Sequence, residues 1–404
     1  MTGKKQVAAD VALNIVATVL PLCVLQLVIL PIMAQDMKGD EYGLVVTVLS
    51  IFTVLPGVFG TALNNVRLIF QNKYIEKDEC GDFNIILLAA GMLCAIACTI
   101  LLVLLGVNDP VSLLLLCLAS LTWISREYFL VAFRLEIDYK SILICNIVQV
   151  IGYVFGYGLF LVFHQWVLVY LVGQGMSLGY ILLKSDLHRE PFRLTKLFKS
   201  TVSDVCALSV SQFLSKFMAY SDRILLYPVI GGTSVGVYYV STLVGKIVSM
   251  AVNPVNGVML TYLSKNKSDN KSKRAFCITM VSAFVVCVAA YCVVMIFGYP
   301  VLAFLYPAYV DEAMVYLPVT SITALVYVLI SVAQPFSLKY YSMKWQIVIN
   351  GATCFIYVLL GIQLLNAYGL MGFCVGALTA NVVKLLIMLA IYVFMKPDSK
   401  SLQP

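Results

Sequence analysis

The stretch Ile85–Leu105, IILLAAGMLCAIACTILLVLL, indicates the fold class because it is apolar throughout and carries no charge. A helix of roughly 20 apolar residues spans the hydrocarbon core of a bilayer. Similar runs follow along the chain, six in each half, with little polar sequence between them. They centre near Leu20, Ile51, Leu93, Leu118, Tyr153, Tyr170, Val210, Val244, Val286, Leu325, Tyr357 and Leu386. We therefore predict an all-α integral membrane protein with twelve transmembrane helices.

The overall composition agrees with this class. Of the 404 residues, 61% are hydrophobic and 12% are charged, and the mean hydropathy is +0.95. A water-soluble fold could not bury so much apolar surface, whereas lipid solvates it. Twelve spans and short connections use up the length, so we expect no large soluble catalytic domain.

Basic residues predict the orientation in the membrane, because they concentrate in cytoplasmic loops. The N-terminal tail and the connections on the same side carry 21 lysine and arginine residues, whereas the opposite connections carry only Lys38. Both termini are therefore predicted to be cytoplasmic. The formal net charge of +7 mostly restates this bias, so it does not indicate nucleic-acid binding.

The chain divides into two similar halves. We predict an N-terminal six-helix half over residues 1–183, a cytoplasmic linker over 184–199 and a C-terminal six-helix half over 200–404. An offset of 193 residues matches Gly39 with Gly232 and Gly43 with Gly236. Because each half has an even number of spans, both enter the membrane in the same sense. The halves thus form a parallel repeat, and the working site is expected in the cleft between them.

Charged residues within the apolar runs are candidates for function, because a charge at mid-membrane costs about 2.5–3.5 kcal/mol on insertion scales. The deep cations exceed the deep anions by five to two. The cations are Arg126, Lys216, Arg223, Lys246 and Lys384, and the anions are Glu127 and Asp222. This surplus favours an anionic ligand in a wet cavity. The alternative is structural: the arginines and Lys216 pair with these two acids, and the other lysines extend to the interface or bond to carbonyls.

Polar residues accompany these cations along single helix faces. Offsets of three, four, seven and eleven residues return to about the same angle on a helix. Such stripes consist of Ser209, Gln212, Lys216 and Arg223 on the seventh predicted helix, and of Tyr239, Thr242, Lys246, Ser249 and Asn253 on the eighth. Further candidates are Lys384 and Asn381 on the twelfth helix, Asn14 and Thr18 on the first, and Asn64, Asn65 and Arg67 on the second. These stripes would supply hydrogen bonds to a polar ligand.

Motifs for covalent chemistry are absent from the sequence. It contains no HExxH motif, no P-loop and no nucleophile elbow. We therefore predict no catalytic residue, no metal site and no cofactor, and expect that the protein is not an enzyme.

One segment resembles a known family. It comprises Ser221-Asp222-Arg223-Ile224-Leu225-Leu226, then Gly231-Gly232, then Val235-Gly236-Val237-Tyr238, with Asn253-Pro254 and Leu263-Ser264 further on. With twelve predicted spans in two halves, the chain resembles the Wzx-type flippases of O-antigen or capsule repeat units. These belong to the multidrug/oligosaccharidyl-lipid/polysaccharide exporter superfamily. Tyr227-Pro228 departs from the glycine-containing turn of that family.

The resemblance implies transport of an undecaprenyl-diphosphate-linked oligosaccharide from the cytoplasmic to the outer leaflet of the bacterial inner membrane, by alternating access. It also implies a role in lipopolysaccharide or other polysaccharide biosynthesis, beside a polymerase and glycosyltransferases. The residues expected to bind the diphosphate and glycan are Lys216, Arg223, Lys246 and Lys384, with Gln212, Asn253 and Asn14 as hydrogen-bonding partners and Arg126, Asn64 and Arg67 as further candidates.

Two alternatives stay open at this point. The first is a multidrug or small-molecule antiporter of the same superfamily, although such pumps usually need acidic lumen residues, which are scarce here. The second is a membrane-embedded polysaccharide polymerase or ligase, although such enzymes typically carry a long external loop with arginines.

Overall fold

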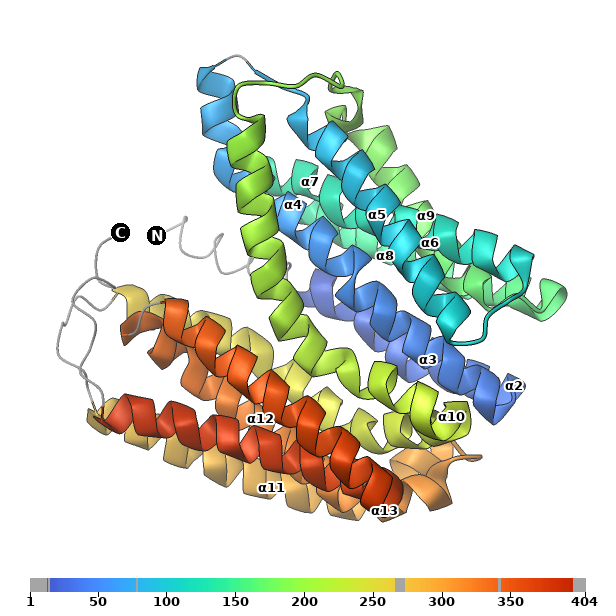
Figure 1. The fold of residues 1–404 in the computed structure, drawn as a ribbon, viewed down its shortest axis with the longest axis vertical. Helices are drawn as coiled ribbons and strands as arrows, with labels where there is room; N and C mark the ends of the chain where they lie inside the picture. The colour runs from blue at the N-terminus through green and yellow to red at the C-terminus, as the bar shows by residue number, and fades with distance from the viewer. Residues whose placement is uncertain (1–12, 14, 78, 266–272, 341–342, 395–404) are drawn as a thin grey trace. The chain divides into compact units, whose positions relative to one another are not determined.

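The structure, a computed structural model, describes residues 13, 15–77, 79–265, 273–340 and 343–394. Within these ranges the chain is almost entirely helical and contains no strand (Figure 1). The elements are the π-helix η1 (Leu25–Ile29), α2 (Leu30–Asp36), α3 (Gly39–Val54), α4 (Pro56–Glu76), α5 (Asp82–Leu104), α6 (Pro110–Phe129), α7 (Val131–Leu135), α8 (Tyr139–Phe163), α9 (Val167–Lys184), the 3-10 helix η2 (Leu187–Arg189), α10 (Phe198–Lys265), α11 (Lys273–Leu305), α12 (Val310–Tyr340) and α13 (Met343–Phe394).

The described helices have the length and surface of membrane spans. Ten helical stretches among the described residues are long and apolar enough to cross a membrane. One of them is α5, on which Leu93 is 69% exposed and Leu104 is 75% exposed. Large apolar side chains gain free energy when they leave water, so these surfaces belong in lipid. The protein is an all-α, multi-pass membrane protein, as the sequence predicts.

Two of the ten stretches continue across a break in the helix. In α10 the break is at Gly231 (φ 79°, ψ 171°), and in α13 it is at Tyr368 and Gly369 (φ 62°, ψ −150°). Glycine adopts a positive φ without steric cost. Both breaks fall where the sequence predicts a connection between two spans. The total of twelve spans stays a prediction.

Prolines coincide with two further irregularities. Helix α3 ends at Val54 and α4 begins at Pro56, which has no N–H to continue the hydrogen-bond ladder. Upstream, the Leu30 N–H donates to the Leu25 carbonyl, a π-type bond directly before Pro31. A missing proline N–H is a common cause of such local changes in helix winding.

The described residues of Met1–Asp36 and Leu44–Ile224 form one compact unit, here called unit 1. Helix α9 packs against α6 and α8, and α6 packs against α4 and α5. A Cβ on Gly152 of α8 would lie 2.8 Å from the Cα of Gly173 on α9, so these two backbones approach closely because both residues lack side chains. A second part of the core places the rings of Phe83 and Tyr128 in a stack, 6.2 Å apart.

Met37–Gly43 and the described residues of Leu225–Pro404 form a second compact unit, here called unit 2. Helix α12 packs against both α11 and α13. Their shared core includes Phe276, Phe336 and Tyr392, and the rings of Phe276 and Tyr392 stack with centroids 3.8 Å apart. Unit 2 is therefore held together by an aromatic core between three long helices.

The start of α3 packs on α10 within unit 2. A Cβ on Gly43 would collide with the backbone of Gly232, directly after the break in α10. The Asp40 carboxylate accepts hydrogen bonds from the Thr233 N–H at 2.9 Å and from the Thr233 hydroxyl at 2.7 Å. The two segments that the sequence matches as repeat partners are thus in direct contact.

Candidate functional site

Arg126 on α6 is the centre of a buried polar network in unit 1. Only 7% of the residue is exposed. Its Nη1 donates to Glu127 Oε1 at 2.7 Å, and its Nε donates to Ser177 Oγ at 3.3 Å. Its Nη2 donates to Gln149 Oε1 at 3.0 Å and also to Asn146 Oδ1. The guanidinium charge is therefore compensated by protein groups on α6, α8 and α9.

This network extends from Arg126 into the helices around it. Gln149 Nε2 and Gln174 Nε2 both donate to the Tyr153 hydroxyl, at 2.7 and 3.4 Å. Asn146 Nδ2 donates to the Ala17 carbonyl at 2.8 Å. Buried polar networks that are well satisfied rigidify a core and select one packing. We therefore assign Arg126 a structural role, which is to hold α6, α8 and α9 in one arrangement within unit 1.

Asn64 on α4 bonds to the end of α6, just before the one-residue interruption at Leu130 that separates α6 from α7. Its Nδ2 donates to the Glu127 carbonyl at 2.8 Å. Carbonyls at the end of a helix lack intrahelical donors, so a side-chain donor satisfies them. Its Oδ1 accepts from Arg134 Nη1, which also donates to Asn65 Oδ1 at 2.9 Å. Asn64 and Arg134 therefore hold α4 against α6 and α7 on either side of this interruption.

Arg67 on α4 ties the linker to unit 1. Its Nη2 and Nη1 donate to the two carboxylate oxygens of Glu190 at 2.5 and 3.1 Å. The guanidinium carbon lies 4.9 Å from the ring centroid of Phe83, a favourable cation–π distance. The linker is anchored again where the Thr195 N–H donates to Asp82 Oδ1 at 2.7 Å. Arg67 thus contacts protein groups of the linker and core.

Arg223 lies on α10 and is 2% exposed. Its Nη1 donates to Ser50 Oγ on α3 at 3.0 Å. Its Nε lies 4.0 Å from Asp222 Oδ1, which also accepts the Arg223 backbone N–H at 2.9 Å. The Asp-Arg pair in the family-like segment therefore joins α10 to α3 within unit 1.

Lys216 and Gln212 form the middle of the predicted stripe on α10. Both are partly buried, and neither side chain makes a hydrogen bond or ion pair with any residue that the structure describes. One turn earlier, the Ser209 hydroxyl is buried and has no hydrogen-bond partner among those residues. These three side chains therefore offer binding capacity that the described part of the protein does not use.

In unit 2, Lys246 on α10 lies beside a cluster of tyrosines. Its Nζ is 5.5 Å from the ring centroid of Tyr239. Tyr239 and Tyr309 pack around Tyr42, with ring centroids 6.3 and 5.5 Å from it, and the Tyr42 hydroxyl donates to the Tyr306 hydroxyl at 3.3 Å. Burial and, to a smaller extent, the Asp40 carboxylate together raise the pKa of Tyr309 to about 12, so this phenol stays neutral.

Lys384 on α13 is partly buried and makes no hydrogen bond or ion pair with a described residue. Lys384 lies fifteen residues after the break at Gly369. Lys246 lies fifteen residues after the break at Gly231, and Lys216 lies fifteen residues before it. At 1.5 Å per residue, each lysine lies about 22 Å along its helix from a break. All three lysines are therefore far inside long apolar helices.

Two of the ten predicted site residues cannot be placed. Asn14 lies outside the described residues, and so does the side chain of Asn253. Of the rest, Arg126 and Asn64 meet at Glu127, whereas Arg67 lies at the linker. The pairing of Arg126 with Glu127, which the sequence offers as the structural alternative, is present in the structure. The further partners Asn146, Gln149 and Ser177 were not predicted, although Asn146 and Gln149 are three residues apart and so share a helix face.

These features define a multi-pass, all-α membrane protein with polar and cationic groups inside its helix bundles, a fold found in solved transporters and flippases. The chain is similar to the lipid II flippase MurJ in an inward closed conformation, with a TM-score of 0.73 and 15% identity over 97% of this chain and 89% of that one. It is also similar to an inward-facing multidrug resistance MATE family transporter of the MOP superfamily, with a TM-score of 0.68 and 12% identity over 94% and 98% of the two chains.

A third similar structure is the MATE transporter VcmN of Vibrio cholerae in its bent form, with a TM-score of 0.55 and 14% identity over 97% of this chain and 98% of that one. No family model matches the sequence, and no curated protein matches it. At these identities the likeness establishes the fold, and the substrate must be argued from the residues themselves.

Proposed function

We propose that this protein is a flippase that moves undecaprenyl-diphosphate-linked oligosaccharide repeat units from the cytoplasmic to the outer leaflet of the bacterial inner membrane. In this proposal, conformational change exposes the polar and cationic side chains alternately to the two sides. The lipid tail stays in the bilayer throughout. The fold shared with a lipid II flippase and with MATE transporters is compatible with this activity.

The proposal rests on the location of Lys216 and Lys384 and on their contacts. Each lies in the interior of a long apolar helix, and neither has an ion-pair partner among the residues described. A lysine at such depth costs about 2.5–3.5 kcal/mol, so it normally faces a polar cavity and has a functional reason. A diphosphate carries about two negative charges, which would offset this cost when the ligand binds.

The neighbouring groups suit the sugar part of this ligand. Ser209 Oγ and the amide of Gln212 lie on the same stripe as Lys216, and neither has a hydrogen-bond partner in the described part of the chain. Glycans present many hydroxyl groups, which act as both donors and acceptors. We therefore propose that Lys216, Lys246 and Lys384 bind the diphosphate and that Gln212, Asn253 and Asn14 bind sugars.

Four of the sequence-predicted candidates have a different role in this proposal. Arg126, Asn64, Arg67 and Arg223 use donors on protein groups of unit 1, as described above. We propose that they hold the helices in place and do not touch the substrate. This division predicts that their loss lowers stability, whereas the loss of Lys216 or Lys384 lowers transport.

The membrane potential provides a driving force for this direction. It contributes about 2.3 kcal/mol per charge per 100 mV. With the cytoplasm negative, two negative charges moving outward gain roughly 4–5 kcal/mol per 100 mV. The membrane potential therefore favours the outward movement of a lipid diphosphate.

A multidrug or small-molecule antiporter is the second candidate, because MATE multidrug transporters have the same fold. The charges distinguish the two. A cationic drug would be repelled by Lys216 and Lys384, whereas a diphosphate would be attracted. This difference in sign favours the flippase.

The test is leaflet-resolved accumulation of lipid-linked oligosaccharide in cells that lack this gene. We expect repeat units to build up on the cytoplasmic face and wild-type protein to relieve this. Lys216→Gln and Lys384→Gln should fail to relieve it at equal membrane levels. Lys199→Gln, an exposed lysine on the same helix as Lys216, is the matched control.

The other outcomes select the alternatives. Normal delivery to the outer leaflet with shortened polymer would indicate a polymerase. Normal delivery and normal polymer, with altered drug sensitivity, would indicate the antiporter. Full relief by both lysine variants would show that the binding residues are assigned wrongly.

A further inference from the structure

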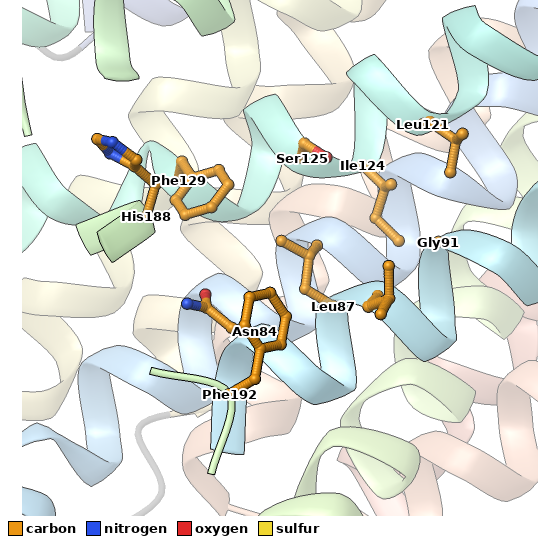
Figure 2. A pocket seen from close by; sticks show the side chains of 10 residues that line it. Asn84, Leu87, Gly91, Leu121, Ile124, Ser125, Phe129, His188 and Phe192 are labelled. Carbon is orange, nitrogen blue, oxygen red and sulfur yellow. The ribbon is translucent and has the colours of Figure 1, made fainter. Parts of the chain in front are cut away.

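A pocket of about 160 Å³ lies between α5, α6 and the linker in unit 1 (Figure 2). Apolar side chains line most of it, among them Leu87, Leu121, Ile124 and Phe129. Asn84 and His188 make one part of the wall polar. None of these residues belongs to the proposed transport site.

Asn84 supplies an unused acceptor in this wall. The residue is 4% exposed, and its Nδ2 donates to the Glu190 carbonyl at 2.8 Å. Because a carbonyl only accepts, this bond fixes the orientation of the amide. Its Oδ1 is then buried and has no hydrogen-bond partner in the described structure. A buried amide oxygen without a partner costs about 1–3 kcal/mol, so a ligand with a donor group would be favoured here.

The pocket opens beside an exposed apolar face of α5, which we expect to contact lipid. Leu88 on α5 and Phe192 on the linker both line it, and they are 51% and 66% exposed. The same face of α5 continues with the exposed residues Met92 and Ile96. Asn84 lies only two residues after the start of α5, at the level expected for lipid headgroups. The occupant therefore enters from the membrane surface, as a lipid does.

The linker beside the pocket attracts negative charge. Arg193 directly follows Phe192, and Lys196 comes three residues later; both are exposed and neither has an ion pair within the described residues. The two linker carboxylates are already engaged, Glu190 with Arg67 and Asp186 with Arg189. Exposed basic residues at a membrane surface bind anionic lipid.

We propose that this pocket binds one anionic phospholipid whose headgroup carries hydroxyl donors, such as phosphatidylglycerol. A headgroup hydroxyl donates to Asn84 Oδ1, and the phosphate lies near Arg193 and Lys196. Cavities of about 150 Å³ hold a molecule the size of benzene, so the pocket accepts a segment of one acyl chain. The lipid bridges α5, α6 and the linker, and this role does not depend on which substrate is transported.

The experiment is native mass spectrometry of the purified full-length protein with added phosphatidylglycerol, phosphatidylcholine or a polyprenyl diphosphate. We expect wild-type protein to retain phosphatidylglycerol in preference. Ser125→Leu fills the pocket from α6 and should abolish retention. Gly91→Ala is a milder second variant, because its Cβ would lie 3.3 Å from Leu121 Cδ2. Arg193→Gln and Lys196→Gln should each weaken retention by about five-fold.

The control is Lys184→Gln, which removes an exposed lysine that does not line the pocket and should leave retention unchanged. Equal retention of the two phospholipids by wild-type protein would overturn the proposal. Unchanged retention in both Ser125→Leu and Gly91→Ala would do the same. Retention of a polyprenyl diphosphate but not of phosphatidylglycerol would assign the pocket to the transported substrate and also overturn it.

Discussion

Removal of Glu190 should destabilise the protein more than removal of its partner Arg67, because the two side chains differ in exposure. The Arg67 side chain is 5% exposed and belongs to a helix, whereas the Glu190 side chain is 18% exposed and belongs to the linker. Loss of one partner from a buried pair costs about 3–5 kcal/mol. In Glu190→Ala the buried guanidinium keeps only its contacts with aromatic rings, which offset about 1–2 kcal/mol.

We therefore expect Glu190→Ala to lower the free energy of unfolding by about 2.5 kcal/mol, the difference between the midpoints of these two ranges. In Arg67→Met the carboxylate can turn to water, so the expected loss is about 1–1.5 kcal/mol. The double variant should resemble Arg67→Met alone, because no buried charge is then left without a partner.

The assay is thermal unfolding of purified protein in detergent, with titration by a denaturing detergent as a second measure. Glu136→Ala, at an exposed position, serves as the matched control and should change little. The reasoning is refuted if Arg67→Met costs as much as Glu190→Ala, or if the double variant shows the sum of the two losses.

Three further changes test other parts of the structure. In Arg126→Lys the charge is kept, but the lysine cannot reach all four acceptors, so the free energy of unfolding should fall by about 2–4 kcal/mol in the same assay. An unchanged midpoint of unfolding would contradict the structural role of this network. Gly43→Val should prevent stable folding because its Cβ would collide with the backbone of Gly232. The control is Gly175→Ala, where a Cβ meets nothing within 4 Å, and it should be neutral or slightly stabilising. The yield of monodisperse protein measures both effects. Hydrogen bonds from Ser112 hold the pKa of Asp109 below its ordinary value. The contribution of this carboxylate is thus present above the unfolded-state pKa and is lost as the pH falls through the lower folded-state pKa. Asp109→Ala should therefore be less stable than wild type at neutral pH, and the difference should disappear as the pH falls below about 4; a constant difference would contradict this.

Hydropathy and charge along the chain were enough to predict the class of protein. The run in α5, the break at Gly231 and the break at Gly369 all lie where a pattern of about 20 apolar residues places them. Insertion into lipid depends on each segment's own composition, because lipid solvates a helix before it packs against another helix. This local dependence makes such features readable from sequence.

The partners of the buried charges depended on tertiary packing. From sequence, Arg126 and Lys384 are both candidates to bind a ligand, since each is a cation inside an apolar run. In the structure, Arg126 meets Asn146, Gln149 and Ser177 from α8 and α9, whereas Lys384 meets no such group among the described residues. The distinction between a structural cation and a candidate ligand-binding cation therefore arises only when the helices pack.

The same limit applies to Arg67 and to the start of α3. The sequence places Arg67 near the end of a span, but its bond to Glu190 links residues 123 positions apart. Gly43 and Gly232 are nearly two hundred residues apart in sequence, and yet their backbones touch. Hydropathy depends on one segment at a time, whereas a hydrogen bond or a close backbone contact needs two segments in a particular register, and only the folded chain provides that register.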